Sequence, residues 1–381
     1  MQQTMKQLAG ATIVAAMSLA GTAHAQAEDV KIGFAAPLTG AQAHYGKDFE
    51  NGITLAVEET NATKPVIGGK PVHFVLDVAD DQADPRTGTT VAQKLVDDGI
   101  KGMLGHFNSG TTIPASRIYA NAGIPEIAMA TAPEYTQQGF KTTFRMMTSD
   151  TQQGSVAGAF AVKSLHMKRI AVVDDRTAYG QGLADEFAKA AKAAGGAIID
   201  REYTNDKAVD FKSILTKLKA QKPDLIYYGG ADSQAAPMVK QMKSLGITAP
   251  LMGGEMVHTP TFLTIAGEAA NGTFASLAGL PLDEMPGGKD YVAKYKKRFG
   301  EEVQTYSPYA YDGAMAMFAA MKAANSTDPA KYLPFLAKTH MPAVTARDLA
   351  YDQHGDLKNG GITIYKVVNG QWTALQSVGG K

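Results

Sequence analysis

The sequence has no cysteine among its 381 residues. It therefore has no disulfide, no thiolate nucleophile and no cysteine-ligated metal site. Basic and acidic side chains number 37 each, so the formal net charge is zero. Without an excess of positive charge, the protein has no general attraction to nucleic acid or to an anionic membrane surface. We expect no nucleic-acid partner, and we expect any partner to be recognised at a local site.

Motifs of phosphate-binding and metal-dependent enzymes are also absent from the sequence. No GxxxxGK[ST] or GxGxxG pattern follows a predicted strand, and the eight histidines include neither HExxH nor a pair four residues apart. Ser109 lacks the GxSxG context of an exposed nucleophile. His106 is better explained as a hydrogen-bonded structural residue than as a ligand or base. We expect no cofactor, no metal and no enzymatic activity, and keep a secreted α/β enzyme as a distant alternative.

The first 25 residues have the features of a secretory signal. Lys6 is their only charged residue, residues 8–20 are mostly apolar or small, and Ala23-His24-Ala25 resembles a cleavage site. The apolar stretch is shorter than the roughly 20 residues that a membrane-spanning helix needs, so an uncleaved anchor is the less favoured alternative. We predict export and cleavage near Ala25.

The rest of the chain is too long for one ordinary hydrophobic core, which stops growing near 250 to 300 residues. Its 45% apolar and 19% charged residues are typical of a globular protein. β-branched runs alternate with amphipathic stretches, which predicts an α/β fold with doubly wound parallel sheets in two lobes. The predicted strands are 30–36, 72–78, 102–105, 124–128, 169–173, 197–202, 224–228 and 250–253, and the predicted helices are 48–59, 85–97, 112–122, 151–165, 182–194, 210–220, 233–245, 291–298 and 309–324.

Small polar residues follow several predicted strands directly. Examples are GHFNSG at 105–110 and GGE at 253–255. In open α/β sheets, ligands bind beyond the carboxyl ends of the strands, where the first N–H groups of the following helices are unpaired. We expect the functional site at these positions.

A set of short segments in the same order along the chain resembles the bacterial branched-chain amino-acid (Leu/Ile/Val) periplasmic binding proteins of ABC transporters. The segments span nearly the whole chain after residue 25, and they are VKIG (30–33), PLTG (37–40), YG (45–46), DDGI (97–100), GH (105–106), PAS (114–116), ATAPE (130–134), YGQG (179–182), YYGG (227–230), MG (252–253) with Glu255, IAGE (265–268) and GDLK (355–358).

This resemblance implies a type I periplasmic binding protein, with two doubly wound parallel-sheet lobes joined by three crossovers. Lobe one would combine residues 26–149 with 279–361, and lobe two would combine 150–278 with 362–381. The protein would close like a clamshell on a small amino acid in the periplasm and deliver it to a membrane ABC permease, acting as a monomer.

The resemblance also implies roles for polar residues at the strand ends. Ser109 and Thr131, with the backbone at Ala130, would hold the ligand α-carboxylate, since a buried carboxylate must keep its hydrogen bonds. Glu255 would receive the α-ammonium, with Tyr179 beside it. Taken alone, Glu255 would be interpreted as a solvated loop acid, and the two hydroxyl residues as turn or cap residues.

Aromatic residues complete the expected site. Tyr45 would form an aromatic wall on the first loop, with Phe107 and Tyr306 near the pocket, although such residues are more often core. Ala231 stands where relatives often carry a bulky aromatic, which would enlarge the side-chain pocket. The preference among leucine, isoleucine, valine, phenylalanine and a non-standard ligand therefore stays open.

One alternative ligand class is a small carboxylate without an ammonium, such as an aromatic acid, or a small urea-like amide. Glu255 argues against the acid, because a buried carboxylate without its partner costs about 2 to 5 kcal/mol. A second alternative, the sensing core of a regulator, would need a DNA-binding segment or a membrane helix, and the sequence predicts neither.

Overall fold

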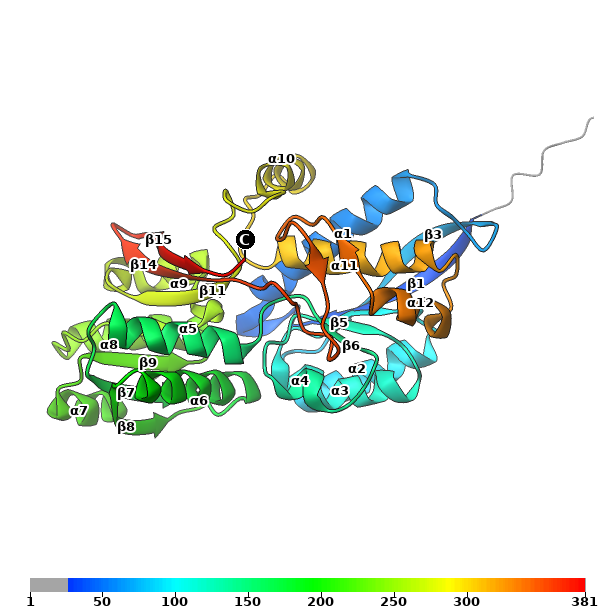
Figure 1. Ribbon diagram of the computed structural model, residues 1–381. Helices are drawn as coiled ribbons and strands as arrows, with labels where there is room; N and C mark the ends of the chain where they lie inside the picture. Colours follow the sequence, from blue (N-terminus) through cyan, green and yellow to red (C-terminus); the bar gives the residue numbers. More distant parts are fainter. Residues whose placement is uncertain (1–26, 381) are drawn as a thin grey trace, which may run out of the picture.

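Figure 1 shows two β-sheets, each with helices on both faces, in the computed structural model, which describes residues 27–380. The predicted secretory signal lies outside the described residues. Among helices in residues 27–380, none has both the length and the hydropathy needed to cross a membrane.

The first sheet has six strands in the order β2-β3-β1-β4-β5-β6. Its central strand β1 pairs in parallel with β3 and β4, whereas the short β2 is antiparallel to β3. Helices α1 and α11 pack against each other on one face, and α2 and α3 pack together on the other. The bounds are β1 (Glu28–Ala36), α1 (Ala43–Ala62), β2 (Val66–Ile67), β3 (Lys70–Asp80), α2 (Pro85–Asp97), β4 (Met103–Gly105), α3 (Ser109–Asn121), β5 (Glu126–Ala128), α4 (Glu134–Gln137), β6 (Thr143–Arg145), α10 (Gly288–Phe299), α11 (Ser307–Ala323), α12 (Pro329–Leu336), β12 (His340–Met341) and β13 (Leu349–Ala350).

The second sheet has seven strands in the order β15-β14-β11-β10-β9-β7-β8. The five from β11 to β8 are parallel, and β14 and β15 extend the edge in antiparallel pairing. The sequence did not indicate β11, β14 or β15. The bounds are α5 (Asp150–Lys163), β7 (Arg169–Asp174), α6 (Ala178–Ala193), β8 (Ala197–Tyr203), α7 (Lys212–Gln221), β9 (Leu225–Gly229), α8 (Asp232–Ser244), β10 (Leu251–Gly253), α9 (Pro260–Ala266), β11 (Phe274–Ala278), β14 (Ile362–Val368) and β15 (Gln371–Val378).

The central strands of each sheet are buried on both faces, which explains why they are apolar without a polar alternation. In β9, Leu225 and Tyr227 belong to the core under α5 and α6, and Tyr227 stacks on Phe187 of α6 with ring centroids 3.7 Å apart. The alternate residues Ile226 and Tyr228 pack under α7, α8 and α9. The predicted doubly wound architecture is therefore confirmed.

The chain crosses between the two sheets at three places, 146–149, 279–287 and 351–361. Hydrogen bonds tie these segments to one another. The backbone N–H of Gly279 donates to the carbonyl of Gly361 at 2.7 Å, and the Thr148 hydroxyl donates to the same carbonyl at 3.3 Å. The predicted type I arrangement, with two lobes and three crossovers, is therefore confirmed. Below, lobe one is the body around the six-stranded sheet and lobe two is the body around the seven-stranded sheet.

Four helices begin three or more residues earlier than their apolar periodicity predicts. Helix α1 begins at Ala43 and not at residue 48, α3 at Ser109 and not at 112, α6 at Ala178 and not at 182, and α10 at Gly288 and not at 291. Their first turns contain polar or small residues, which give no apolar stripe to detect. Tyr45, Ser109 and Tyr179 consequently lie in first helical turns, and Tyr45 is not on a loop as expected.

Asp48 of α1 fixes the start of α11. It is 3% exposed, and its Oδ2 accepts three consecutive backbone N–H groups, from Thr305, Tyr306 and Ser307, at 3.0, 2.6 and 3.1 Å. Burial raises the pKa of Asp48, while these hydrogen bonds lower it again. The first N–H groups of a helix have no acceptor within the helix, so the Asp48 carboxylate supplies the acceptor at the start of α11.

We expect Asp48→Ala to lower the free energy of unfolding by about 1 to 3 kcal/mol, because buried N–H groups lose their acceptor. Asp48→Asn should lower the free energy of unfolding by less, since the amide oxygen of asparagine can still accept hydrogen bonds from these N–H groups. Urea unfolding of both variants measures this. Asp98→Ala, which removes an exposed pair with Lys94, is the control and should change little. Equal effects of Asp48→Ala and Asp98→Ala would contradict the capping role.

Candidate functional site

The candidate residues gather where the carboxyl ends of the strands of one sheet face the other lobe. From lobe one, residues that follow β1, β4 and β5 contribute, together with Tyr306 directly before α11, and from lobe two, residues that follow β7 and β10. All eight predicted site residues are buried, with at most 4% of their surface exposed, and they are Tyr45, Phe107, Ser109, Ala130, Thr131, Tyr179, Glu255 and Tyr306. The hydrogen bonds and ring contacts below divide them into three groups.

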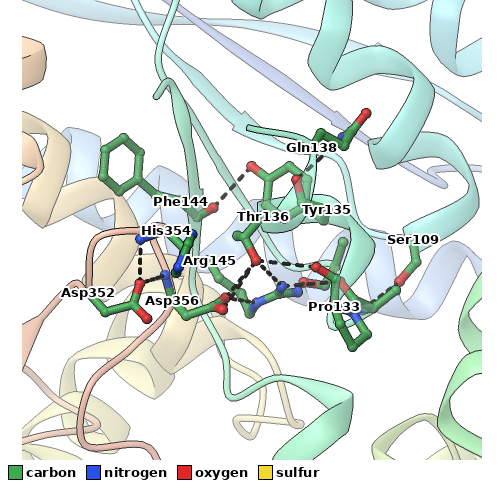
Figure 2. Close-up of polar contacts among 12 residues, drawn as sticks. Ser109, Pro133, Tyr135, Thr136, Gln138, Phe144, Arg145, Asp352, His354 and Asp356 are labelled. Carbon is green, nitrogen blue, oxygen red and sulfur yellow. Dashed lines mark hydrogen bonds and ion pairs between the residues drawn. The ribbon is translucent and has the colours of Figure 1, made fainter. Parts of the chain in front are cut away.

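The first group is made of hydroxyl and backbone groups in lobe one. Ser109 is the first residue of α3, and its Oγ accepts the N–H of Ala132 at 3.3 Å (Figure 2). The carbonyl of Thr131 accepts the N–H of Asp150 at 2.8 Å, which holds the 130–132 loop against the start of α5. The first N–H groups of α3 and the hydroxyls of Ser109 and Thr131 form a set of donors suited to an anion.

The second group surrounds the carboxylate of Glu255 in lobe two. Its Oε2 accepts the side-chain amide of Gln153 at 2.5 Å and the hydroxyl of Tyr179 at 2.9 Å. Gly254 permits this approach, because a Cβ there would lie 2.4 Å from the Tyr179 hydroxyl oxygen. Glu255 is thus a buried acid with defined donors and not the solvated loop acid that its sequence context alone suggested.

A second buried acid, Asp150 at the start of α5, lies close to Glu255. It is 0% exposed, and its Oδ2 has no hydrogen-bond partner among residues 27–380. Burial raises the pKa of Asp150 well above its ordinary value, and the negative charge of Glu255 raises it further. Burial also raises the pKa of Glu255, against hydrogen bonds from Gln153 and Tyr179 that lower it.

The Thr131 hydroxyl lies close enough to both carboxyl groups to lower the pKa of each. The hydroxyl residue of lobe one and the acid of lobe two are therefore neighbours. Two carboxylates buried together repel each other unless a proton or a cation lies between them. This corner of the site favours a positively charged group.

The third group is a wall of aromatic rings in lobe one. Tyr45 stacks on Phe107 with centroids 5.3 Å apart, and Tyr306 meets both rings edge-on, at 5.8 and 4.8 Å. Burial and then the charge of Glu255 raise the pKa of Tyr306 well above its ordinary value, which places this wall beside the acidic corner. The Tyr306 hydroxyl has no hydrogen-bond partner within the described part of the chain.

Hydrogen bonds from α1 and from the segment before α11 connect the two lobes. The Tyr45 hydroxyl donates to the carbonyl of Met256 at 2.6 Å and accepts the N–H of Asp232 at 3.2 Å. His44 Nε2 lies 2.9 Å from the carboxylate of Asp232, and the Thr305 hydroxyl donates to the carbonyl of His258 at 3.0 Å. A groove of about 460 Å³ lies beside these contacts, and both lobes line it, with Asn108 from one and Tyr179, Ala231 and Met256 from the other.

His106, which the sequence left open as a base or a ligand, is held in a buried hydrogen-bond network. His106 is buried between Asp81, 2.7 Å from Nδ1, and the Tyr119 hydroxyl, 3.1 Å from Nε2. The expected structural role of His106 agrees with this geometry. Over residues 27–380, no three histidine, aspartate or glutamate side chains come together as a metal site requires.

Asp150 and Gln153 are the site residues that sequence reasoning missed. They stand three residues apart in the first turn of α5, directly after the first crossover, and both are buried. An acid and an amide at this spacing project from one helix face, so the signal was present. It was indistinguishable from an ordinary helix start, which commonly carries an acid in its first turn.

Comparisons with known proteins agree with this geometry. A family model described as periplasmic binding protein matches residues 29–371. The Leu/Ile/Val-binding protein homolog 1 of Brucella melitensis is 36% identical over 358 residues, which cover 94% of each chain. The branched-chain amino acid transporter substrate-binding protein LivJ of Streptococcus pneumoniae, solved with isoleucine, has a TM-score of 0.83 at 25% identity, over 92% of this chain and 100% of LivJ.

A further solved structure binds a different class of ligand. The solute-binding protein of an ABC transporter from Rhodopseudomonas palustris, in complex with 3,4-dihydroxybenzoic acid, has a TM-score of 0.79 at 25% identity, over 92% of this chain and 98% of that chain. The predicted resemblance to Leu/Ile/Val-binding proteins is confirmed by the sequence relatives. These relatives are binding proteins, which also confirms the prediction that the chain is not an enzyme.

We expect Glu255→Gln to raise the free energy of unfolding of the ligand-free protein at pH 7. The folded state raises the pKa of Glu255, so ionisation of this group opposes folding, and one pKa unit is worth about 1.4 kcal/mol. The gain should be complete above the folded pKa and vanish as the pH falls to the unfolded pKa. Urea unfolding at several pH values, after refolding to remove bound ligand, measures it.

The exposed Glu134 supplies the matched control, since Glu134→Gln should leave stability unchanged at every pH. If Glu255→Gln instead destabilised the ligand-free protein at pH 7, Glu255 would be a structural acid with a permanent cationic partner.

Proposed function

The chain belongs to the periplasmic binding protein family, and from this premise we propose that it captures an L-amino acid for an ABC transporter. Leucine, isoleucine and valine are the expected ligands. The observation that carries this proposal is the acidic corner of Glu255 and Asp150 beside the donors of Ser109 and Thr131. A zwitterion is the small ligand whose two charges match both ends of this arrangement.

The donors of lobe one would bind the α-carboxylate. Ser109 stands at the N-terminus of α3, where unpaired N–H groups and the helix dipole favour an anion. The 130–132 loop adds the Thr131 hydroxyl and its backbone. The carboxylate would keep the hydrogen bonds that it had in water, which is the condition for burying it.

The acids of lobe two would bind the α-ammonium. An ammonium carries three N–H donors, and the buried oxygens of Glu255 and Asp150 are the acceptors nearest to them. Its positive charge would also relieve the repulsion between the two carboxylates and lower the pKa of both. Tyr179 and Gln153 hold Glu255 in position for this contact.

The aromatic wall and Ala231 would enclose the ligand side chain. Tyr45, Phe107 and Tyr306 present apolar ring surface, and Ala231 at the edge of the 460 Å³ groove leaves space that a larger residue would fill. These surfaces suit an aliphatic side chain, which gains about 25 cal/mol for each Å² removed from water.

The competing ligand class is a small carboxylic acid without an ammonium, which the Rhodopseudomonas palustris relative supports. The two buried acids of this chain argue against it. A third negative charge in the same site would raise the repulsion, and no cationic group of the ligand would compensate. An amino acid is therefore the better candidate.

We further propose that ligand binding closes the two lobes. Lobe one would consist of residues 26–149 and 279–361, and lobe two of 150–278 and 362–381, with the three crossovers as the hinge. The contacts of Tyr45 and His44 with Met256 and Asp232 would then belong to the closed form. Closing on the ligand would give the permease a shape to recognise.

The proposed site of action is the periplasm, reached by export and by cleavage near Ala25. The partner would be a membrane ABC permease, and the protein would act as a monomer. The family to which the chain belongs is periplasmic, which supports this placement.

Titration calorimetry of the mature protein with leucine tests the proposal. Glu255→Ala should weaken leucine binding by about tenfold or more, and Ser109→Ala by less, because backbone donors remain at the carboxylate end. Wild type should also bind 4-methylpentanoic acid, which is leucine without its ammonium, about tenfold more weakly than leucine. Glu255→Ala should reduce this preference.

Glu268→Ala is the matched control, because Glu268 is an acid of lobe two whose side chain is 91% exposed. It should leave both affinities unchanged. Equal affinity of wild type for leucine and 4-methylpentanoic acid would refute the role of Glu255 and favour an acid as the ligand.

A further inference from the structure

Arg145 is a buried arginine directly behind the 130–132 loop. It ends β6, and its side chain is 0% exposed. Figure 2 shows its guanidinium between Asp356 on one side and the segment of Pro133 on the other. Its hydrogen bonds are from Nε to Asp356 at 2.7 Å, from Nη2 to the Thr136 hydroxyl at 3.0 Å and to the Ala132 carbonyl at 3.1 Å, and from Nη1 to the Ala130 carbonyl.

These bonds determine how the peptide groups of the loop are oriented. Arg145 donates hydrogen bonds to the carbonyls of Ala130 and Ala132. The backbone N–H of Asp150 donates to the carbonyl of Thr131. In a trans peptide the N–H points opposite to the C=O. Because the Ala130 carbonyl points at the guanidinium, the Thr131 N–H points away from it, on the side opposite Arg145.

The charge of Arg145 is only partly neutralised. Its hydrogen-bonded carboxylate partner, Asp356, has a side chain that is 28% exposed, whereas the guanidinium is fully buried. Solvent therefore screens the negative partner more than the positive one, and low dielectric around the guanidinium preserves its field. The charge of Arg145 also lowers the pKa of the buried Asp150. That field acts on the loop through the Ala130–Thr131 peptide, whose carbonyl faces the guanidinium and whose N–H points away from it, in the manner of a preorganised anion site.

We infer that Arg145 is a positioning residue that sets the specificity of the site for a carboxylate. It would act through the peptide groups of residues 130–132, without touching the ligand. It would favour a carboxylate over an uncharged amide at the same place. This inference rests on the proposed function, since it assigns the preference to the carboxylate end of an amino-acid site.

Comparison of leucine with leucinamide separates this role from a merely structural one. Both ligands carry the ammonium and the same side chain, and only leucine carries the carboxylate. A loss of loop structure weakens the binding of both ligands alike, whereas a loss of positive charge weakens the binding of leucine alone. The measured quantity is the ratio of the Kd of leucinamide to the Kd of leucine, from calorimetric titrations at low ionic strength.

We expect Arg145→Gln to weaken leucine binding by about tenfold or more and leucinamide binding by less than about threefold. The ratio of the Kd of leucinamide to the Kd of leucine therefore falls. Arg145→Lys keeps the charge and should retain most of the ratio. Arg117→Gln is the matched control, because Arg117 is an exposed arginine on α3 of the same lobe, and it should leave the ratio unchanged.

Asp356→Asn provides an independent test if Arg145→Gln does not fold. It removes the counter-charge, while three hydrogen bonds to the loop and Thr136 still hold Arg145. The ratio should therefore rise above that of wild type. A structural role of the pair predicts the contrary, a parallel loss of both affinities with the ratio unchanged.

The outcomes distinguish this inference from the proposed function. If wild type binds neither leucine nor leucinamide, the proposed function fails and the inference fails with it. If wild type binds leucine and neither Arg145→Gln nor Asp356→Asn changes the ratio, the proposed function stands and the role of Arg145 is refuted.

Discussion

The interaction on which the rest of the site depends is the repulsion between two carboxyl groups buried together. Glu255 and Asp150 are almost wholly removed from water, and the pKa of each is raised by that burial. A protein that buries two acids side by side stores free energy that a cation can release. The ammonium of an amino acid is such a cation, and its carboxylate must then be held at the other end.

The fold makes both ends available at one place. The doubly wound sheets turn the carboxyl ends of their strands toward each other, so that helix N-termini supply donors from lobe one while Glu255 comes from lobe two. Buried polar groups fix the geometry from behind, with Asp48 holding the start of α11 and Tyr306, Arg145 holding the 130–132 loop and Tyr179 holding Glu255. The site is thus specified by side chains around it as well as by those that line it.

The sequence predicted much of this and missed parts of it for physical reasons. Strand and helix alternation sufficed for the fold class, because buried parallel strands have few polar residues. It did not predict β14 and β15, since β15 is mostly exposed and lacks a clear apolar face. The resemblance led to Glu255 and Thr131, which the structure brings together. Asp150, Gln153 and Arg145 could not be selected, because their importance comes from burial and from partners far away in the sequence, such as Glu255 for Asp150.

The most direct test of the account is a crystal structure of the mature protein with leucine. We expect the ligand nitrogen within hydrogen-bond distance of Glu255, with Asp150 beside it, and the carboxylate oxygens on Ser109 and the backbone of Thr131. A ligand bound elsewhere, or a complex in which Glu255 faces solvent, would contradict the account.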